Sequence, residues 1–221
     1  MRPAPIDLVL FDLDGTLADT APDLAAAANR QRADRGLEPL PIDQLRPMAS
    51  HGARGLIGRA LGLAPGDADY EAARIEFLDY YWQGLCVQTR LFAGMAETLD
   101  RLEAMGRRWG VVTNKASRFT EPLMERLGLH RRAACVVSGD TTQHAKPHPA
   151  PIQHALKSCA VGSERAVYVG DDLRDVQAGR AAGVATVIAA YGYLGVDVDI
   201  LSWGGDHVID APAQLLTWIG G

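Results

Sequence analysis

Short apolar segments alternate with amphipathic segments along most of this chain. The first apolar segment, 6–11, is rich in β-branched residues and ends at a polar turn, as buried strands do. Similar segments follow at 110–114, 134–138, 166–171 and 184–189, and 207–209 is a candidate edge strand. Helical patterns lie between or after them at 95–105, 118–127, 149–159 and 175–182, with a last helix ending near 218. The alternation predicts an α/β fold with a doubly wound parallel sheet.

The segment 19–87 interrupts this alternation, because it contains no convincing strand. Helical patterns run from Thr20 to about Gly36 and then cover 42–45, 54–61 and 70–85. Thr20 is the expected N-cap of the first helix, with Asp23 three residues later as its capping partner. We therefore expect two domains: a catalytic core made of 1–18 and 88–221, and a helical-bundle cap domain inserted at 19–87.

The last of these helical patterns predicts which side of its helix is buried. Ile75, Leu78, Tyr81 and Trp82 fall on one stripe at helical spacing. An apolar stripe of this kind normally faces the interior of a helical bundle. We therefore expect these four side chains to pack inside the cap.

Composition narrows the class of protein. The 221 residues are 48% hydrophobic, and 22 Lys and Arg stand against 27 Asp and Glu, which argues against a nucleic-acid partner. The longest apolar stretch, 181–191, is too short to span a bilayer. Cys86, Cys135 and Cys159 form no CxxC motif and are odd in number, so a disulfide framework is not expected. These features predict a cytoplasmic protein without a membrane or nucleic-acid partner, as a monomer or homodimer.

Polar and charged side chains follow four of the predicted strands, at the sheet edge where α/β proteins bind ligands. They are Asp12 and Asp14 after the first strand, Thr113 and Asn114 after the second, Lys146 after the third, and Asp171, Asp172 and Asp175 after the fourth. Several carboxylates meeting at one edge repel each other, and a divalent cation relieves this repulsion. Oxygen ligands suit Mg²⁺, which commonly pairs with substrate phosphate. The cluster therefore predicts a Mg²⁺ and phosphoryl site.

Four motifs carry a resemblance to a known family. Residues 12–16 read DLDGT, 111–115 read VVTNK, 146–149 read KPHP and 170–175 read GDDLRD. In this order they resemble the four motifs of the haloacid dehalogenase (HAD) superfamily phosphatases. The helical insertion after the first motif is similar to the cap of phosphoglycolate phosphatases. The resemblance covers essentially the whole chain and implies a Rossmann-like core.

The resemblance also implies a mechanism. Asp12 would be the nucleophile and form an aspartyl-phosphate, and Asp14 would serve as general acid and then general base. Mg²⁺ would be bound by Asp12, by the backbone carbonyl of Asp14 and by Asp171. Its water molecules would be oriented by Asp175 and Asp172.

The remaining motif residues would bind the transferring phosphoryl group. Thr113 supplies a hydroxyl and Lys146 a positive charge, and both would also count as catalytic. Asn114 adds a further donor to the same group.

Substrate choice is expected to depend on the cap. Arg54, His51 and Arg46 lie between predicted cap helices, and guanidinium groups pair well with carboxylates. A solvent-facing turn with surface arginines is the alternative. We expect Arg54→Ala to raise KM for an acidic substrate if Arg54 binds it.

The resemblance leaves the substrate open between two relatives. One is phosphoglycolate phosphatase, and the other is N-acetylmuramic acid 6-phosphate phosphatase of peptidoglycan recycling. Both substrates carry a carboxylate and a phosphate, so the expectation is a Mg²⁺-dependent phosphomonoesterase acting on a small acidic metabolite. A phosphomutase and a non-catalytic phosphate-binding module are the other interpretations, and a dehalogenase is disfavoured by the acids of the fourth motif.

Overall fold

The core is built on one parallel sheet, as the sequence predicts. The computed structural model describes residues 5–195 and 198–220, so residues 1–4, 196, 197 and 221 of the expected core lie outside the described residues. The sheet has six strands in the order β5-β4-β1-β6-β7-β8, all parallel. These strands are β1 (Leu8–Phe11), β4 (Arg108–Val112), β5 (Val136–Val137), β6 (Ala166–Gly170), β7 (Ala185–Ala189) and β8 (His207–Ile209).

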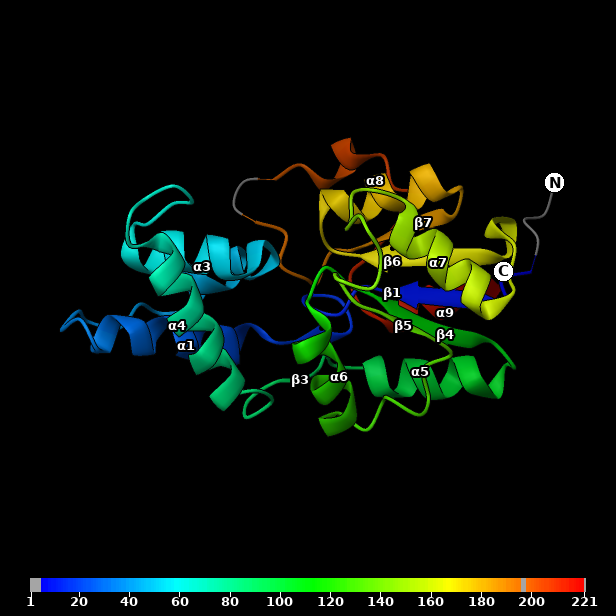
Figure 1. The fold of residues 1–221 in the computed structure, drawn as a ribbon. Coiled ribbons are helices and arrows are strands. Elements are labelled where there is room, and N and C mark those ends of the chain that lie inside the picture. The colour runs from blue at the N-terminus through cyan, green and yellow to red at the C-terminus, as the bar shows by residue number, and fades with distance from the viewer. Residues whose placement is uncertain (1–4, 196–197, 221) are drawn as a thin grey trace.

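Helices cover both faces of this sheet (Figure 1). On one face lie α7 (Ala150–Cys159) and α8 (Leu173–Ala182), and on the other lie α5 (Met95–Ala104) and α9 (Ala213–Gly220). Helix α6 (Ser117–Arg126) follows β4, and the short 3₁₀ turns are η2 (Ser163–Arg165) and η3 (Ile200–Trp203). The α/β prediction is confirmed.

The central strand β1 explains the continuous apolar pattern of the first segment. Leu8 and Leu10 pack into one buried cluster, and Val9 and Phe11 pack into the other. Because a strand points alternate side chains to opposite faces, a strand covered on both faces must be apolar at every position. Strand β1 also separates the two halves of the strand order, and a ligand crevice is expected at its carboxyl end.

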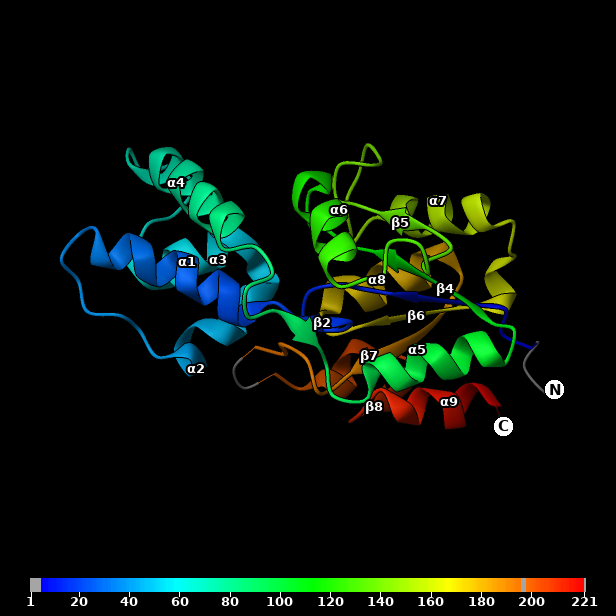
Figure 2. The same cartoon turned by 90° about the horizontal axis from the view of Figure 1, so that it is seen from below.

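The segment between the first and second core strands forms a separate group of helices. They are α1 (Ala21–Ala33), α2 (Ile42–Leu45), η1 (Arg46–His51), α3 (Gly52–Leu61) and α4 (Tyr70–Gln83). This group lies beyond the carboxyl end of β1, away from the two termini (Figures 1 and 2). The position supports the expected cap, whose boundaries at 19 and 87 stay a prediction.

Two short strands join this helical group to the core. Strand β2 (Ala18–Asp19) pairs antiparallel with β3 (Arg90–Leu91), so the outgoing and returning chain run side by side. Asp23 strengthens this connection by accepting hydrogen bonds from the backbone nitrogens of Gln88 and Thr89 at 2.8 and 3.0 Å. The expected capping role of Asp23 is therefore wrong, because its carboxylate is used by the returning chain.

Two expectations for the cap helices also need correction. Thr20 occupies the N-cap position of α1, but its hydroxyl donates to Asp14 at 2.5 Å and makes no capping bond. In α4 the stripe is only partly correct: Tyr81 is buried, whereas Ile75 and Trp82 are 56% and 50% exposed. The buried side of α4 is instead made by Tyr70, Ala73, Phe77 and Tyr81. Within the described residues, no helix has the length and apolarity needed to cross a membrane.

Candidate active site

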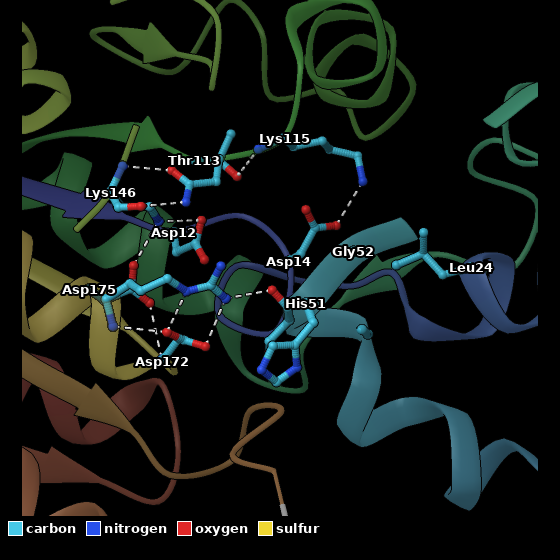
Figure 3. Close-up of a pocket in the computed structure, with 14 residues that line it drawn as sticks. Asp12, Asp14, Leu24, His51, Gly52, Thr113, Lys115, Lys146, Asp172 and Asp175 are labelled. Atoms are coloured by element: carbon cyan, nitrogen blue, oxygen red, sulfur yellow. Dashed lines mark hydrogen bonds and ion pairs between the residues drawn. The ribbon is translucent and has the colours of Figure 1, made fainter. Parts of the chain in front are cut away.

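A pocket of about 270 Å³ opens at the carboxyl end of β1, between the core and the cap (Figure 3). Asp12 and Asp14 enter it from the turn after β1, and Thr113 and Asn114 enter from the turn after β4. Lys146 also lines it. The parallel sheet thus brings together three segments that are distant in sequence, as the motif positions predict.

Lys146 is the central cation of the pocket. Its Nζ lies 2.9 Å from Oδ1 of Asp12 and 2.7 Å from Oδ1 of Asp175, and it donates to the hydroxyl of Tyr168 at 2.7 Å. Burial alone would lower the pKa of Lys146, but Asp12 and Asp175 outweigh it and the pKa is raised. Lys146 therefore stays charged at the point where a phosphoryl oxygen would bind.

Three carboxylates form a compact acidic cluster beside Lys146. Oxygen atoms of Asp12, Asp171 and Asp175 all lie within 4.8 Å of one another. Burial, opposed by Lys146 and reinforced by the neighbouring carboxylates, raises the pKa of Asp12 to about 6. Burial and the charges of Asp12 and Asp175 raise the pKa of Asp171 well above its usual range. A cluster that resists ionisation in this way has the donor set of a cation site.

The buried carboxylate of Asp171 is held by neighbours from distant segments. It accepts a hydrogen bond from the hydroxyl of Thr16 at 2.6 Å and another from the backbone nitrogen of Tyr193 at 2.8 Å. A Cβ at Gly192 would lie 2.3 Å from the Cβ of Asp171, so only glycine permits this approach. Thr16 belongs to the DLDGT motif, whereas Gly192 and Tyr193 lie outside all four motifs, and the sequence predicts no site role for any of the three.

The carboxylate of Asp14 is turned away from the acidic cluster. Its Oδ1 lies 3.0 Å from Nζ of Lys115 and accepts the Thr20 hydrogen bond described above. Lys115 also lies over the ring of Tyr81, 4.5 Å from the ring centre. Burial lowers the pKa of Lys115 and Asp14 raises it, with a net increase. Lys115 is a site residue that the sequence analysis did not single out, although it directly follows Thr113 and Asn114.

Asn114 supports the loop that carries Lys146. Its side-chain nitrogen donates to the backbone carbonyl of Lys146 at 2.8 Å, and its side-chain oxygen accepts from the backbone nitrogen of Lys146 at 2.9 Å. These two bonds fix Lys146 relative to β4. The expected role of Asn114 as a phosphate donor stays a prediction, and the structure adds this positioning role.

Asp172 lies outside the compact acidic cluster. Its side chain caps α8 by accepting from the backbone nitrogen of Arg174, and its two oxygens accept from Nε and Nη2 of Arg174 at 2.8 and 2.9 Å. Arg174 also donates to the backbone carbonyl of Ser50 in the cap at 2.6 Å. Arg174 therefore links the core to the cap.

The three cap candidates occupy different surroundings. His51 lines the pocket with its neighbours Ser50 and Gly52. Arg46 points elsewhere, since its Nη1 pairs with Asp19 at 2.7 Å. Arg54 is exposed and is not among the residues that line the pocket. Of the three, only His51 is brought to the motif residues, and the substrate roles of Arg46 and Arg54 stay predictions.

Comparison with known proteins agrees with this geometry. The haloacid dehalogenase-like hydrolase family matches residues 9–189. An N-acetylmuramic acid 6-phosphate phosphatase from Pseudomonas putida is 42% identical over 207 residues, covering 94% of this chain and 93% of the relative. A phosphoglycolate phosphatase from Xanthomonas campestris is 43% identical over 208 residues, covering 94% of this chain and 93% of the relative.

Solved structures show the same fold. The crystal structure of a predicted phosphoglycolate phosphatase from Haemophilus somnus is 29% identical and superimposes with a TM-score of 0.85, covering 97% of this chain and 98% of that chain. The matched residues 9–189 include the motif residues and the intervening helices, and the relatives extend the match to nearly the full length. The chain therefore belongs to the haloacid dehalogenase-like hydrolase family.

Proposed function

We propose that this protein is a Mg²⁺-dependent phosphomonoesterase that acts on a small acidic phosphorylated metabolite, with Asp12 as its nucleophile. The observation that carries the proposal is the position of Asp12, which lies 2.9 Å from the ammonium of Lys146 and within the cluster formed with Asp171 and Asp175. An anionic nucleophile beside a cation and a cation site is the arrangement that phosphoryl transfer requires.

The residues present fit a magnesium ion. The donor set consists of carboxylate oxygens, which Mg²⁺ prefers. The pKa values of Asp12 and Asp171 are raised because these carboxylates are buried close to other carboxylates, and a bound cation would stabilise their ionised forms. Asp12, Asp171 and the backbone carbonyl of Asp14 are the proposed ligands, with Asp175 beside them. When bound, the ion supplies Lewis-acid stabilisation of negative charge on the transferring phosphoryl group.

The chain's own side chains then account for the two chemical steps. A carboxylate oxygen of Asp12 forms a bond to phosphorus while the ester P–O bond breaks, and Asp14 donates a proton to the departing alcohol. In the second step Asp14 accepts a proton from water, whose oxygen bonds to phosphorus and releases Asp12 and inorganic phosphate. Thr113 and Lys146 hold the phosphoryl oxygens throughout.

Two substrates follow from the names of the relatives. One is 2-phosphoglycolate, and the other is N-acetylmuramic acid 6-phosphate. Both combine a phosphate ester with a carboxylate, and His51 and Arg174 add positive or polar groups to the mouth of the pocket. The proposed substrate class is therefore an acidic phosphate ester, and a cytoplasmic metabolite is consistent with it.

Release of inorganic phosphate tests this proposal. The purified protein should release phosphate from p-nitrophenyl phosphate and from both named esters with Mg²⁺, and the release should stop with EDTA. Conversion of a sugar phosphate to an isomer without phosphate release would indicate a phosphomutase instead. No metal-dependent release from any ester would contradict the proposal.

A further inference from the structure

A second cavity adjoins the candidate active site. It encloses about 420 Å³ between α4 of the cap and α6 of the core, and Leu24 and Lys115 line both this cavity and the active-site pocket. Because Lys115 contacts Asp14, the cavity begins beside the residue proposed to protonate the leaving group. Its position is therefore where the leaving group of a substrate would extend.

The cavity has the apolar walls of a small-molecule site. Phe77, Leu78 and Phe119 contribute to its lining, and a further hollow of about 250 Å³ continues from it past Trp82. Trp82 is 50% exposed, and its ring centre lies 6.3 Å from that of Phe119. These side chains explain why the expected apolar stripe of α4 is not buried: part of it forms this groove.

Four charged side chains line the groove, and two of them are already paired: Arg74 with Glu71 and Lys115 with Asp14. The other two are Arg118 and Asp79. Arg118 stacks on Phe119, with its guanidinium carbon 4.4 Å from the ring centre, and Asp79 lies on the opposite helix. Within residues 5–195 and 198–220, neither Arg118 nor Asp79 forms an ion pair. A guanidinium that lies over a ring and has no ion-pair partner among the described residues is available to bind a carboxylate.

The volumes of the active-site pocket and of the adjoining cavity favour a large leaving group over a small one. The active-site pocket of about 270 Å³ must hold the phosphoryl group, a cation and its water molecules, and a two-carbon glycolate adds little to this. The adjoining cavity of about 420 Å³ falls within the range of sites that bind whole small molecules. A pyranose ring has apolar C–H faces for the aromatic walls and hydroxyl groups for Asp79.

We infer that the groove between α4 and α6 is a leaving-group subsite for a sugar that carries a carboxylate, and that Arg118 binds this carboxylate. The inference rests on the proposed phosphatase function and selects between its two substrate classes. Arg118 is then a specificity-determining residue, and it acts on substrate choice without contacting the phosphoryl group.

Three phosphate esters separate these roles. N-acetylmuramic acid 6-phosphate has both the sugar and the carboxylate. N-acetylglucosamine 6-phosphate has a similar sugar but no carboxylate, and 2-phosphoglycolate has a carboxylate but no sugar. The wild-type protein should hydrolyse the first with a kcat/KM at least about tenfold above the other two, since a charged hydrogen bond is worth about 1.5–3 kcal/mol.

Arg118→Gln is the decisive variant, and Arg131→Gln is its control, because Arg131 is an exposed arginine outside the groove. Arg118→Gln should lower kcat/KM for N-acetylmuramic acid 6-phosphate about tenfold or more and change the other two values less than about twofold. Trp82→Ala should raise KM for both sugar phosphates and leave 2-phosphoglycolate unchanged. Arg131→Gln should change none of the three.

The possible failures are distinct. A wild-type preference for 2-phosphoglycolate would overturn the subsite while leaving the phosphatase function intact. An equal loss on all three esters in Arg118→Gln, or no loss on any of them, would also overturn the subsite. Absence of Mg²⁺-dependent release from every ester would overturn the proposed function and the subsite with it.

Discussion

The phosphoryl end and the leaving-group end of the candidate site are built in different ways. At the phosphoryl end, Asp12, Lys146 and Asp175 project from the ends of strands or the adjacent segments and are connected by direct ion pairs. At the leaving-group end, Arg118 and Trp82 are exposed on helix surfaces, and Arg118 forms no ion pair with any of the described residues.

The difference suggests that the residues of the phosphoryl end carry out the reaction, whereas those of the leaving-group end select the substrate. Buried charges must be paired, so each side chain at the phosphoryl end is constrained by several others and a change to one affects all. The helix surfaces at the other end carry few such constraints. Substitutions there are expected to change substrate preference with little effect on the fold.

Asp12→Asn should give the largest effect on activity. An amide is not a nucleophile, so kcat should fall at least about 10³-fold. Tm should not decrease, because Lys146 keeps its pair with Asp175 and the variant removes a buried carboxylate whose charge is disfavoured by burial and by Asp175. Steady-state phosphate release and a thermal melt measure the two quantities. Activity above a few per cent of wild type would show that Asp12 is not the nucleophile.

Lys146→Met should combine lost activity with lost stability. It leaves Asp12 and Asp175 without their shared cation, and breaking a buried ion pair costs about 3–5 kcal/mol. Urea unfolding in EDTA measures this cost, and Mg²⁺ should recover part of it. Lys157→Met, at an exposed position of α7, is the matched control and should be close to wild type.

Thermal stability without a cation should depend on pH in a specific direction. The pKa of Asp12 is raised from 3.8 to about 6 and that of Asp171 is also raised well above its usual range, so the folded protein binds more protons than the unfolded chain. The free energy of unfolding in EDTA should therefore fall as pH rises through 4–6 and beyond. The increase in Tm on adding Mg²⁺ should accordingly be greater at pH 7 than at pH 5. An increase that does not depend on pH would argue against the carboxylate cluster as the cation site.

Arg54→Ala should have the smallest effect, because Arg54 is exposed and lies outside the pocket lining. We expect KM for an acidic substrate to stay within about twofold of wild type, as is usual for a surface position. A several-fold increase in KM would instead show that the cap closes far enough to bring Arg54 to the substrate, in agreement with its sequence-based role.

The order of elements and the phosphoryl end could be predicted from the sequence because both depend on local patterns. A strand buried on both faces must be continuously apolar, and the polar residues that follow it must lie at the sheet edge. The sequence therefore identifies Asp12, Thr113 and Lys146 as site residues, and the alternation of apolar and helical segments alone predicts the parallel sheet.

What only the tertiary structure decided depends on contacts between distant segments. The stripe of α4 predicted burial of Trp82, but no local pattern reveals that α6 lies opposite and leaves a groove there. The pairing of Lys115 with Asp14, and of Arg46 with Asp19, likewise joins residues that are distant in sequence. Periodicity identifies an apolar face, whereas the packing of the whole chain determines whether that face becomes interior or binding surface.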